Sequence, residues 1–267
     1  FAQAATEAEQ STVKLNAFKR YRLNVWTANE VRWLDPQQWE ACAGEGAADP
    51  IAWRVATLEA MRGQPCFAGL DLGSTSDLSA LALLFDGSVI VPWFWCPESA
   101  LEKKDNALRD QYAAWARDGF LTLTPGNVCD YDRVRADIKA LSEKYSIVDI
   151  AVDRLFQAAQ ICTQLQGDGI EVVSFGQGFA SMAAPCKEFG ERVIGGRFVH
   201  GNNPVLNWMA GNCSVAEDEA GNIKPVKPKK KSQHKIDGIV STIMALGRSM
   251  VNGSASSVYD ERGVVEL

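Results

Sequence analysis

An acidic residue at the end of an otherwise apolar segment constrains the fold most. The stretch CFAGLDLGSTSDLSALALLF, residues 66–85, predicts a strand, a turn of small residues and a second strand. Asp71 ends the first strand, and Gly73 follows two residues later. Burying a carboxylate costs free energy unless a hydrogen-bond donor, a positive charge or a metal ion compensates for it, so we expect Asp71 to have such a partner. Three interpretations remain open: a metal ligand for nuclease chemistry, a metal ligand for ATP, or a residue that only shapes the turn.

From residue 66 onward, strands and helices follow one another in a regular order. The segments 78–85 and 89–95 flank Asp86-Gly87, a dipeptide typical of a two-residue hairpin turn. Beyond them the patterns predict helices over 98–118, 130–145, 155–166, 178–194, 203–211 and 235–250, strands over 147–153 and 170–175, and a hairpin over 213–226. This order predicts an α/β fold with a mixed central sheet, in which three antiparallel strands are extended by parallel strands and flanked by helices.

Composition and charge fit a globular protein with one unusual segment. The 267 residues are 46% hydrophobic and 22% charged, which is enough to build a sizeable core. The net charge of −6 does not indicate a general nucleic-acid binder, but residues 224–235, KPVKPKKKSQHK, hold six lysines and no acid. This basic segment fits either a solvated loop or a surface that contacts phosphates.

The cysteines and the apolar runs exclude several classes of protein. Seven cysteines are spaced at least 24 residues apart and form no C-x-x-C pair, which predicts reduced, structural thiols of a cytosolic protein and no zinc site. No apolar run approaches the roughly 20 residues of a membrane span. The first residues, FAQAATEAEQST, lack a signal-peptide pattern. Since the chain does not begin with Met, we interpret it as an excised or processed piece.

Two further aspartates occupy positions comparable to that of Asp71. Asp153 ends the strand over 147–153, and Asp237 lies at the start of the last helix. Neighbouring parallel strands place their carboxyl ends at one edge of a sheet, so we expect Asp71 and Asp153 to converge there and the last helix to add Asp237. Close carboxylates repel one another unless cations intervene, and their oxygens suit Mg²⁺ or Mn²⁺.

A pair of such ions is the expected cofactor. Two ions about 3.5–4 Å apart activate a water and stabilise the leaving oxygen in phosphodiester cleavage. We assign the bridging position to Asp71, on the most rigid strand, and an auxiliary position to Asp77. Each acid also has a structural interpretation: a turn at Asp71, a helix cap at Asp153 and a favourable helix dipole at Asp237. Asp149 lies near the start of its strand, so we expect it to be solvated.

Several separated segments together resemble a known family. They are GLDLGSTSDLSALALLF, AVDRLFQAAQI, FVHGNNPVLNWMAGN and KIDGIVSTIMALGR, with LNVWTANEVRWLDPQQWEAC as an extension toward the N-terminus. The similarity, over most of residues 66–250, is to the RNase H-like nuclease domain of the large terminase subunit of tailed double-stranded-DNA phages. It implies a divalent-metal endonuclease that cuts concatemeric DNA at the start and end of genome packaging, with Asp71, Asp153 and Asp237 as catalytic residues and metal ligands.

The resemblance also implies partners and a compartment. The basic segment matches a region where the family carries an auxiliary hairpin near DNA, which implies DNA contacts from Lys227, Lys229, Lys230, Lys231 and Lys235, with His234 as a further candidate. The implied partners are double-stranded DNA and, for the full-length protein, the small terminase subunit and the portal, with no membrane. The implied location is the cytoplasm of the infected bacterial host.

One family feature is missing from the sequence. Full large terminases carry an ATPase motor with a G-x-x-x-x-G-K-[ST] phosphate loop, and this chain contains no such motif. We therefore expect that the chain does not translocate DNA by itself. We divide it into a lead-in from the ATPase side (1–65), the RNase H-like nuclease domain (66–251) and a flexible tail (252–267).

Two rival functions remain. GLDLGSTS also resembles the first phosphate loop of actin-like and sugar-kinase ATPases, but these need a second loop of Asp-Gly-Gly-Thr type, and VIGGRF at 193–198 lacks its acid. A non-catalytic DNA-binding or docking module that keeps the fold is the other rival. A Ser-His-Asp hydrolase is disfavoured because there is no G-x-S-x-G motif.

Overall fold

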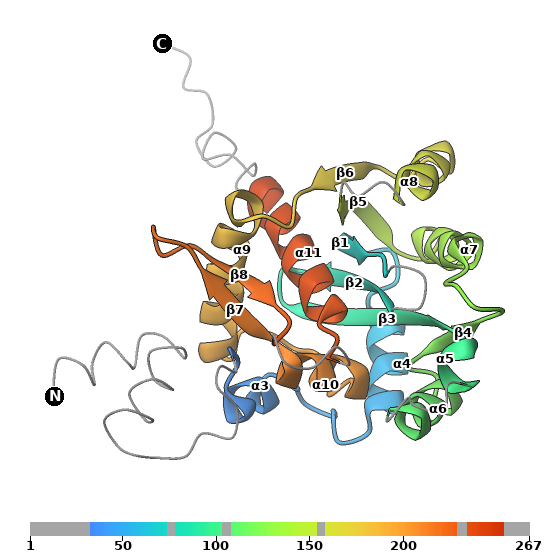
Figure 1. Ribbon diagram of the computed structural model, residues 1–267, viewed down its shortest axis with the longest axis horizontal. Coiled ribbons are helices and arrows are strands. Elements are labelled where there is room, and N and C mark those ends of the chain that lie inside the picture. The colour runs from blue at the N-terminus through green and yellow to red at the C-terminus, as the bar shows by residue number, and fades with distance from the viewer. Residues whose placement is uncertain (1–32, 74–77, 103–107, 154–157, 229–233, 254–267) are drawn as a thin grey trace, which may run out of the picture.

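A single six-stranded sheet forms the centre of the molecule (Figure 1). The computed structural model describes residues 33–73, 78–102, 108–153, 158–228 and 234–253. The strands of the sheet are β1 (Pro65–Asp71), β2 (Ser79–Phe85), β3 (Val89–Pro97), β4 (Thr122–Thr124), β5 (Ser146–Asp153) and β6 (Val172–Phe175). Their order is β4-β3-β2-β1-β5-β6, with β1, β2 and β3 antiparallel and the other pairings parallel. The mixed sheet predicted from the sequence is confirmed.

The hairpin between β2 and β3 has the predicted turn. Asp86 and Gly87 have φ angles of 46° and 64°, the left-handed conformations that a type I′ turn requires at both central positions. Pro92 in β3 pairs with Ala82 of β2, whereas β4 pairs only with Trp95–Pro97. The ring therefore lies beyond the short β4, at a free part of the strand edge, as expected for a residue without an N–H group.

Helices cover both faces of the sheet (Figure 1). They are α3 (Pro36–Ala41), α4 (Pro50–Ala60), α5 (Ser99–Glu102), α6 (Arg109–Arg117), α7 (Tyr131–Ser142), α8 (Ala158–Gly167), α9 (Phe179–Ile194), α10 (Pro204–Asn212) and α11 (Asp237–Gly253). Hydrophobic residues of α4, α7 and α8 pack on one face, and those of α3, α9, α10 and α11 pack on the other. Aspartates cap α3 and α7, since Asp35 and Asp130 each accept two backbone N–H groups.

A separate hairpin lies against α9. Its strands, β7 (Ser214–Glu217) and β8 (Ile223–Val226), form a two-stranded antiparallel sheet of their own. The ammonium group of Lys224 lies 5.0 Å from the ring centre of Phe179, at the start of α9. This confirms the hairpin predicted over 213–226. The hairpin leads directly into the basic segment.

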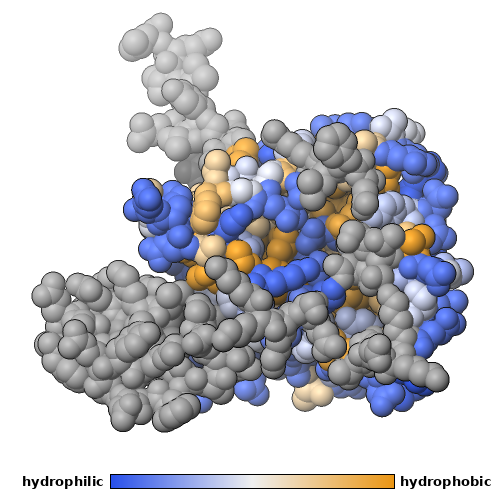
Figure 2. All heavy atoms as spheres, in the orientation of Figure 1, coloured by the Kyte–Doolittle hydropathy of each residue, from blue (hydrophilic) through white to orange (hydrophobic). Residues whose placement is uncertain are grey.

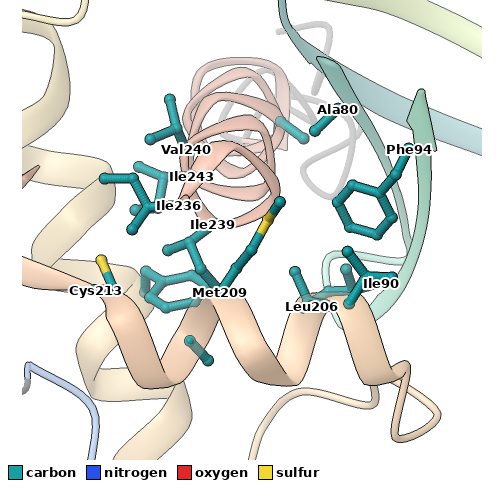
Figure 3. Packing of buried hydrophobic residues seen from close by; sticks show 14 of the residues in the cluster. Ala80, Ile90, Phe94, Leu206, Met209, Cys213, Ile236, Ile239, Val240 and Ile243 are labelled. Atoms are coloured by element: carbon teal, nitrogen blue, oxygen red, sulfur yellow. The ribbon is translucent and has the colours of Figure 1, made fainter. Parts of the chain in front are cut away.

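Helix α11 crosses the sheet in close contact with β1. Ile239, Ile243 and Leu246 of this helix are fully buried. Figure 3 shows Ile239 beside Met209 of α10, within the same hydrophobic cluster. Under the middle of the helix lies Gly69 of β1, where an added Cβ would overlap the backbone carbonyl oxygen of Ser241. A glycine at this position lets the helix axis approach the sheet.

The expectation that Asp149 is solvated is wrong. Asp149 is 3% exposed, and both of its oxygens accept hydrogen bonds from Arg248 of α11 at 2.9–3.1 Å. Asn252 adds a further donor at 3.2 Å. Position 149 faces the crossing helix, and the helix brings a guanidinium that offsets the cost of burying the carboxylate. The pair fastens the C-terminal half of α11 to β5.

Part of the predicted lead-in region packs on the same core. The rings of Trp33 and Trp39 lie 5.4 and 6.2 Å from that of Phe189 in α9. The division of the chain at residue 65 remains a prediction. The first 32 residues and the last 14 lie outside the described residues.

The remaining broad expectations concern membranes and thiols. In the part of the chain that the structure describes, none of the helices combines the length and apolar character needed to cross a bilayer. All seven cysteines are free and six are buried, in agreement with the predicted structural thiols.

The contact at Gly69 generates a stability prediction. Replacing Gly69 with Ala would push the new methyl group into the Ser241 carbonyl, so we expect the free energy of unfolding to fall by roughly 3 kcal/mol. The matched control is Gly211→Ala in α10, where a Cβ meets no atom within 4 Å, and this change stabilises by roughly 0.5–1 kcal/mol. Urea unfolding measures both, and equal midpoints for the two variants would contradict the close crossing.

Candidate metal centre

Asp71 and Asp153 end neighbouring parallel strands. Leu70 pairs with Val152 across β1 and β5, so the next residues along the two strands are Asp71 and Asp153. Side chains alternate between the faces of a sheet, and Gly69 faces α11. The two aspartates therefore lie at one edge of the sheet, on the face that α11 covers.

The first turn of α11 brings Asp237 to the same level of the sheet. Asp71 pairs with Ala80 of β2, and Ala80 pairs with Phe94 of β3, so these residues form one row across the sheet. Gly238 packs on this row, because an added Cβ there would lie 2.8 Å from the Phe94 ring. Asp237 precedes Gly238 and is only 6% exposed.

The surface on the side of the molecule seen in Figure 1 is mixed in character. Figure 2, in the same orientation, shows hydrophobic residues in the middle of this side, between hydrophilic ones.

Each buried carboxylate has a different neighbour. The side-chain amide of Gln177 donates a hydrogen bond of 2.9 Å to Oδ1 of Asp71. The ammonium group of Lys227, just after β8, lies 3.7 Å from Oδ1 of Asp237. The other oxygen of Asp237, Oδ2, is buried and has no hydrogen-bond partner among the described residues. A buried carboxylate oxygen without a donor is costly, and a cation would satisfy it.

The acids influence one another electrostatically. Burial, followed by the charges of Asp237 and Asp153, raises the pKa of Asp71 to about 7, against the opposing effects of the Gln177 hydrogen bond and the charge of Lys227. Such a shift shows that the three acids share one electrostatic environment. Near neutral pH, Asp71 is poised between its protonated and ionised forms.

The donor set fits a hard divalent ion by its chemistry. All three acids offer carboxylate oxygens, which Mg²⁺ and Mn²⁺ prefer. Among the described residues, however, no three His, Cys, Asp or Glu side chains are close enough to form a ready-made metal cage. Carboxylates repel one another, and a bound cation would offset this repulsion. The structure thus brings the acids to one place without closing them into a cluster.

The other predicted site residues are placed only in part. Asp77, Lys229, Lys230 and Lys231 lie outside the described residues. Lys227 lies beside Asp237, as described above. His234 and Lys235 are partly buried immediately before α11, and burial lowers the pKa of Lys235 against the opposing charge of Asp237.

The turn interpretation of Asp71 finds no support in the described part of the turn. There the N–H of Gly73 donates to the hydroxyl oxygen of Ser79, and Tyr131 donates its hydroxyl to the Gly73 carbonyl. The carboxylate of Asp71 instead accepts from Gln177, which sequence reasoning missed. Gln177 lies two residues after the end of β6, between Gly176 and Gly178. Its place at the carboxyl end of a parallel strand was the available signal.

Comparison with known proteins identifies the class of this fold and site. The family model described as "Terminase large subunit, endonuclease domain" matches residues 1–252. The chain belongs to this family, whose nuclease domains have an RNase H-like fold. Both the predicted resemblance and the predicted fold are confirmed.

The similar proteins include phage and bacterial sequences. The terminase large subunit of Enterobacteria phage HK97 is 32% identical over 238 residues, which cover 87% of this chain and 44% of that protein. Protein YmfN of Escherichia coli (strain K12) is 29% identical, with coverage of 92% and 54%. The crystal structure of the HK97 large terminase matches with a TM-score of 0.67 at 30% identity, with coverage of 92% and 50%. The chain thus spans about half the length of the relatives it matches.

The raised pKa of Asp71 generates a prediction about stability without metal. Because the pKa is raised above the unfolded value of roughly 4, ionisation costs the folded state free energy as pH rises from about 4 through 7. Asp71→Asn removes this cost and still accepts from Gln177. In EDTA at pH 8, we expect the free energy of unfolding of the variant to be on the order of 4 kcal/mol higher than that of wild type. At pH 4 the two should be equal. Urea titrations at both pH values measure this, and a variant less stable at pH 8 would contradict it.

Proposed function

We propose that this chain is a metal-dependent endonuclease that cuts concatemeric double-stranded DNA during phage genome packaging by two-metal-ion hydrolysis. Asp71, Asp153 and Asp237 are the proposed ligands of Mg²⁺ or Mn²⁺, and Asp77 is an auxiliary ligand. The observation that carries the proposal is the meeting of acids from three distant segments at one edge of the sheet, in a chain of the terminase endonuclease family. Further support comes from Oδ2 of Asp237, which no hydrogen-bond donor reaches within the described part of the chain.

In the proposed mechanism, different residues of the chain have different roles. Bound divalent ions supply water activation and stabilisation of the leaving oxygen. Asp71 and Asp153 lie at the ends of buried strands, which hold their carboxylate oxygens in fixed positions. Asp237 adds its charge from the first turn of α11. Lys227, which contacts Asp237, brings a positive charge to the place where a phosphate must approach.

The partners follow from the family and remain part of the proposal. Double-stranded DNA is the proposed substrate. Because the chain spans about half of its relatives, the small terminase subunit and the portal are proposed as partners of a longer protein. The proposed place of action is the cytoplasm of the infected bacterium.

Substitution of each acid tests the mechanism. We expect Asp71→Asn, Asp153→Asn and Asp237→Asn each to lower the rate of plasmid cleavage in Mg²⁺ or Mn²⁺ by about 100-fold or more, because each change removes a charged oxygen ligand. The control is Asp132→Asn on the exposed surface of α7, which leaves the rate unchanged. The measurement is supercoiled-plasmid cleavage, with circular dichroism spectra to verify folding.

Three outcomes would contradict the proposal. The first is a folded Asp71→Asn variant that still cleaves at the wild-type rate. The second is DNA binding by wild type without metal-dependent cutting, which would favour a non-catalytic module. The third is a rise in melting temperature that is specific to ATP, which would favour the ATP-binding interpretation.

The basic segment generates a separate prediction about binding. Replacing Lys229, Lys230 and Lys231 together with Gln should weaken DNA binding equally for unrelated sequences, because lysines contact phosphates without reading bases. The slope of log affinity against log salt should become shallower by about 0.9 for each lost phosphate contact. Fluorescence anisotropy in EDTA measures this without cleavage. Lys139→Gln, which removes an ion pair with Asp168, is the control, and an unchanged slope in the triple variant would contradict the assignment.

A further inference from the structure

We propose that Gln177 is a positioning residue of the metal centre, whose amide occupies Oδ1 of Asp71 and leaves Oδ2 for a divalent cation. This inference rests on the proposed metal-dependent function and adds to it a residue outside the acidic triad. It starts from the hydrogen bond of 2.9 Å between Nε2 of Gln177 and Oδ1 of Asp71.

The orientation of the amide is fixed by its neighbours. The NH₂ group of Gln177, and not its carbonyl, faces Oδ1 of Asp71. This orientation matches the ionised form of Asp71, which only accepts hydrogen bonds. The same Nε2 lies 4.0 Å from the sulfur of Met244 in α11, and Met244 is fully buried. Both neighbours of the NH₂ group are therefore acceptors, and turning the amide over would lose both contacts.

The loop that carries Gln177 is held on both sides. Phe175, two residues earlier, pairs with Asp153 and packs so closely on α11 that a Cβ at Gly247 would lie 2.9 Å from its ring. Gly178, the next residue, is the N-cap of α9. The position of Gln177 is thus set by β6 and α9 together. Its contact with Asp71 is built into the fold.

A neutral donor suits this position. A lysine or arginine at 177 would hold Asp71 but would repel an incoming cation, whereas an amide holds the carboxylate without opposing charge. The hydrogen bond at Oδ1 limits rotation of the Asp71 carboxylate and so holds Oδ2 in place. Groups that orient metal-binding carboxylates in this way typically change metal affinity by about 10- to 100-fold when they are removed.

The test compares Gln177→Met with wild type in the 267-residue chain. Methionine keeps the length of the side chain and removes the N–H groups. We expect its dissociation constant for Mn²⁺, measured at pH 8 by the electron paramagnetic resonance signal of free Mn²⁺, to rise by about 10-fold or more. The metal-free melting temperature should stay within about 4 °C of wild type, because a single neutral hydrogen bond contributes little net stability.

Two further variants sharpen the comparison. Gln177→Asn keeps the amide but is one methylene too short to reach Asp71, so it should weaken Mn²⁺ binding to a similar extent. Gln166→Met makes the same chemical change at an exposed position of α8 and should leave Mn²⁺ binding unchanged.

Each outcome decides the inference. Unchanged Mn²⁺ affinity in Gln177→Met, with normal uptake by wild type, would overturn the inference and leave the proposed function intact. Weaker Mn²⁺ binding together with a fall of more than about 5 °C in the metal-free melting temperature would show that Gln177 only anchors its loop. This result would also overturn the inference. If wild type takes up no Mn²⁺, the proposed metal centre fails and this inference fails with it.

Discussion

The contact between α11 and β1 at Gly69 determines where the candidate site forms. The helix carries Asp237 at its first residue, and the strand carries Asp71 at its last. Because no side chain separates helix and strand at Gly69, the backbone of the helix packs directly against the strand there. The same helix reaches β5 through Arg248 and Asp149. Fixing the helix at two points fixes the direction in which its first turn presents the acid.

The candidate site balances charges that the fold forces together. Three carboxylates at one edge oppose one another, and the surroundings moderate this in two ways. A neutral amide holds Asp71, while a positive side chain lies beside Asp237. The remaining oxygen of Asp237 is not satisfied by any protein donor in the described residues. An arrangement of this kind costs folding free energy and favours the binding of cations, as expected where a protein gives up stability for function.

Much of this architecture was predictable from the sequence because it depends on local patterns. Apolar runs located the strands, Asp86-Gly87 specified the hairpin, and the ends of two strands marked Asp71 and Asp153. The contacts that depend on distant segments were not predictable. Arg248 and Asp149 are 99 residues apart and share no pattern, so Asp149 was expected in solvent. Gln177 is an uncharged residue in a short loop, and only the strand order shows that it faces Asp71. Pairing of Lys227 with Asp237 likewise depends on how the β7–β8 hairpin lies on α9.

The β7–β8 hairpin affects how substitutions can alter the candidate site. The cation beside Asp237 comes from a small sheet that shares no strand pairing with the main one. Replacements in the hairpin therefore act on the charge balance around the acids without breaking the hydrogen bonds of the central strands. The charge beside Asp237 can thus differ between chains that share the same central sheet.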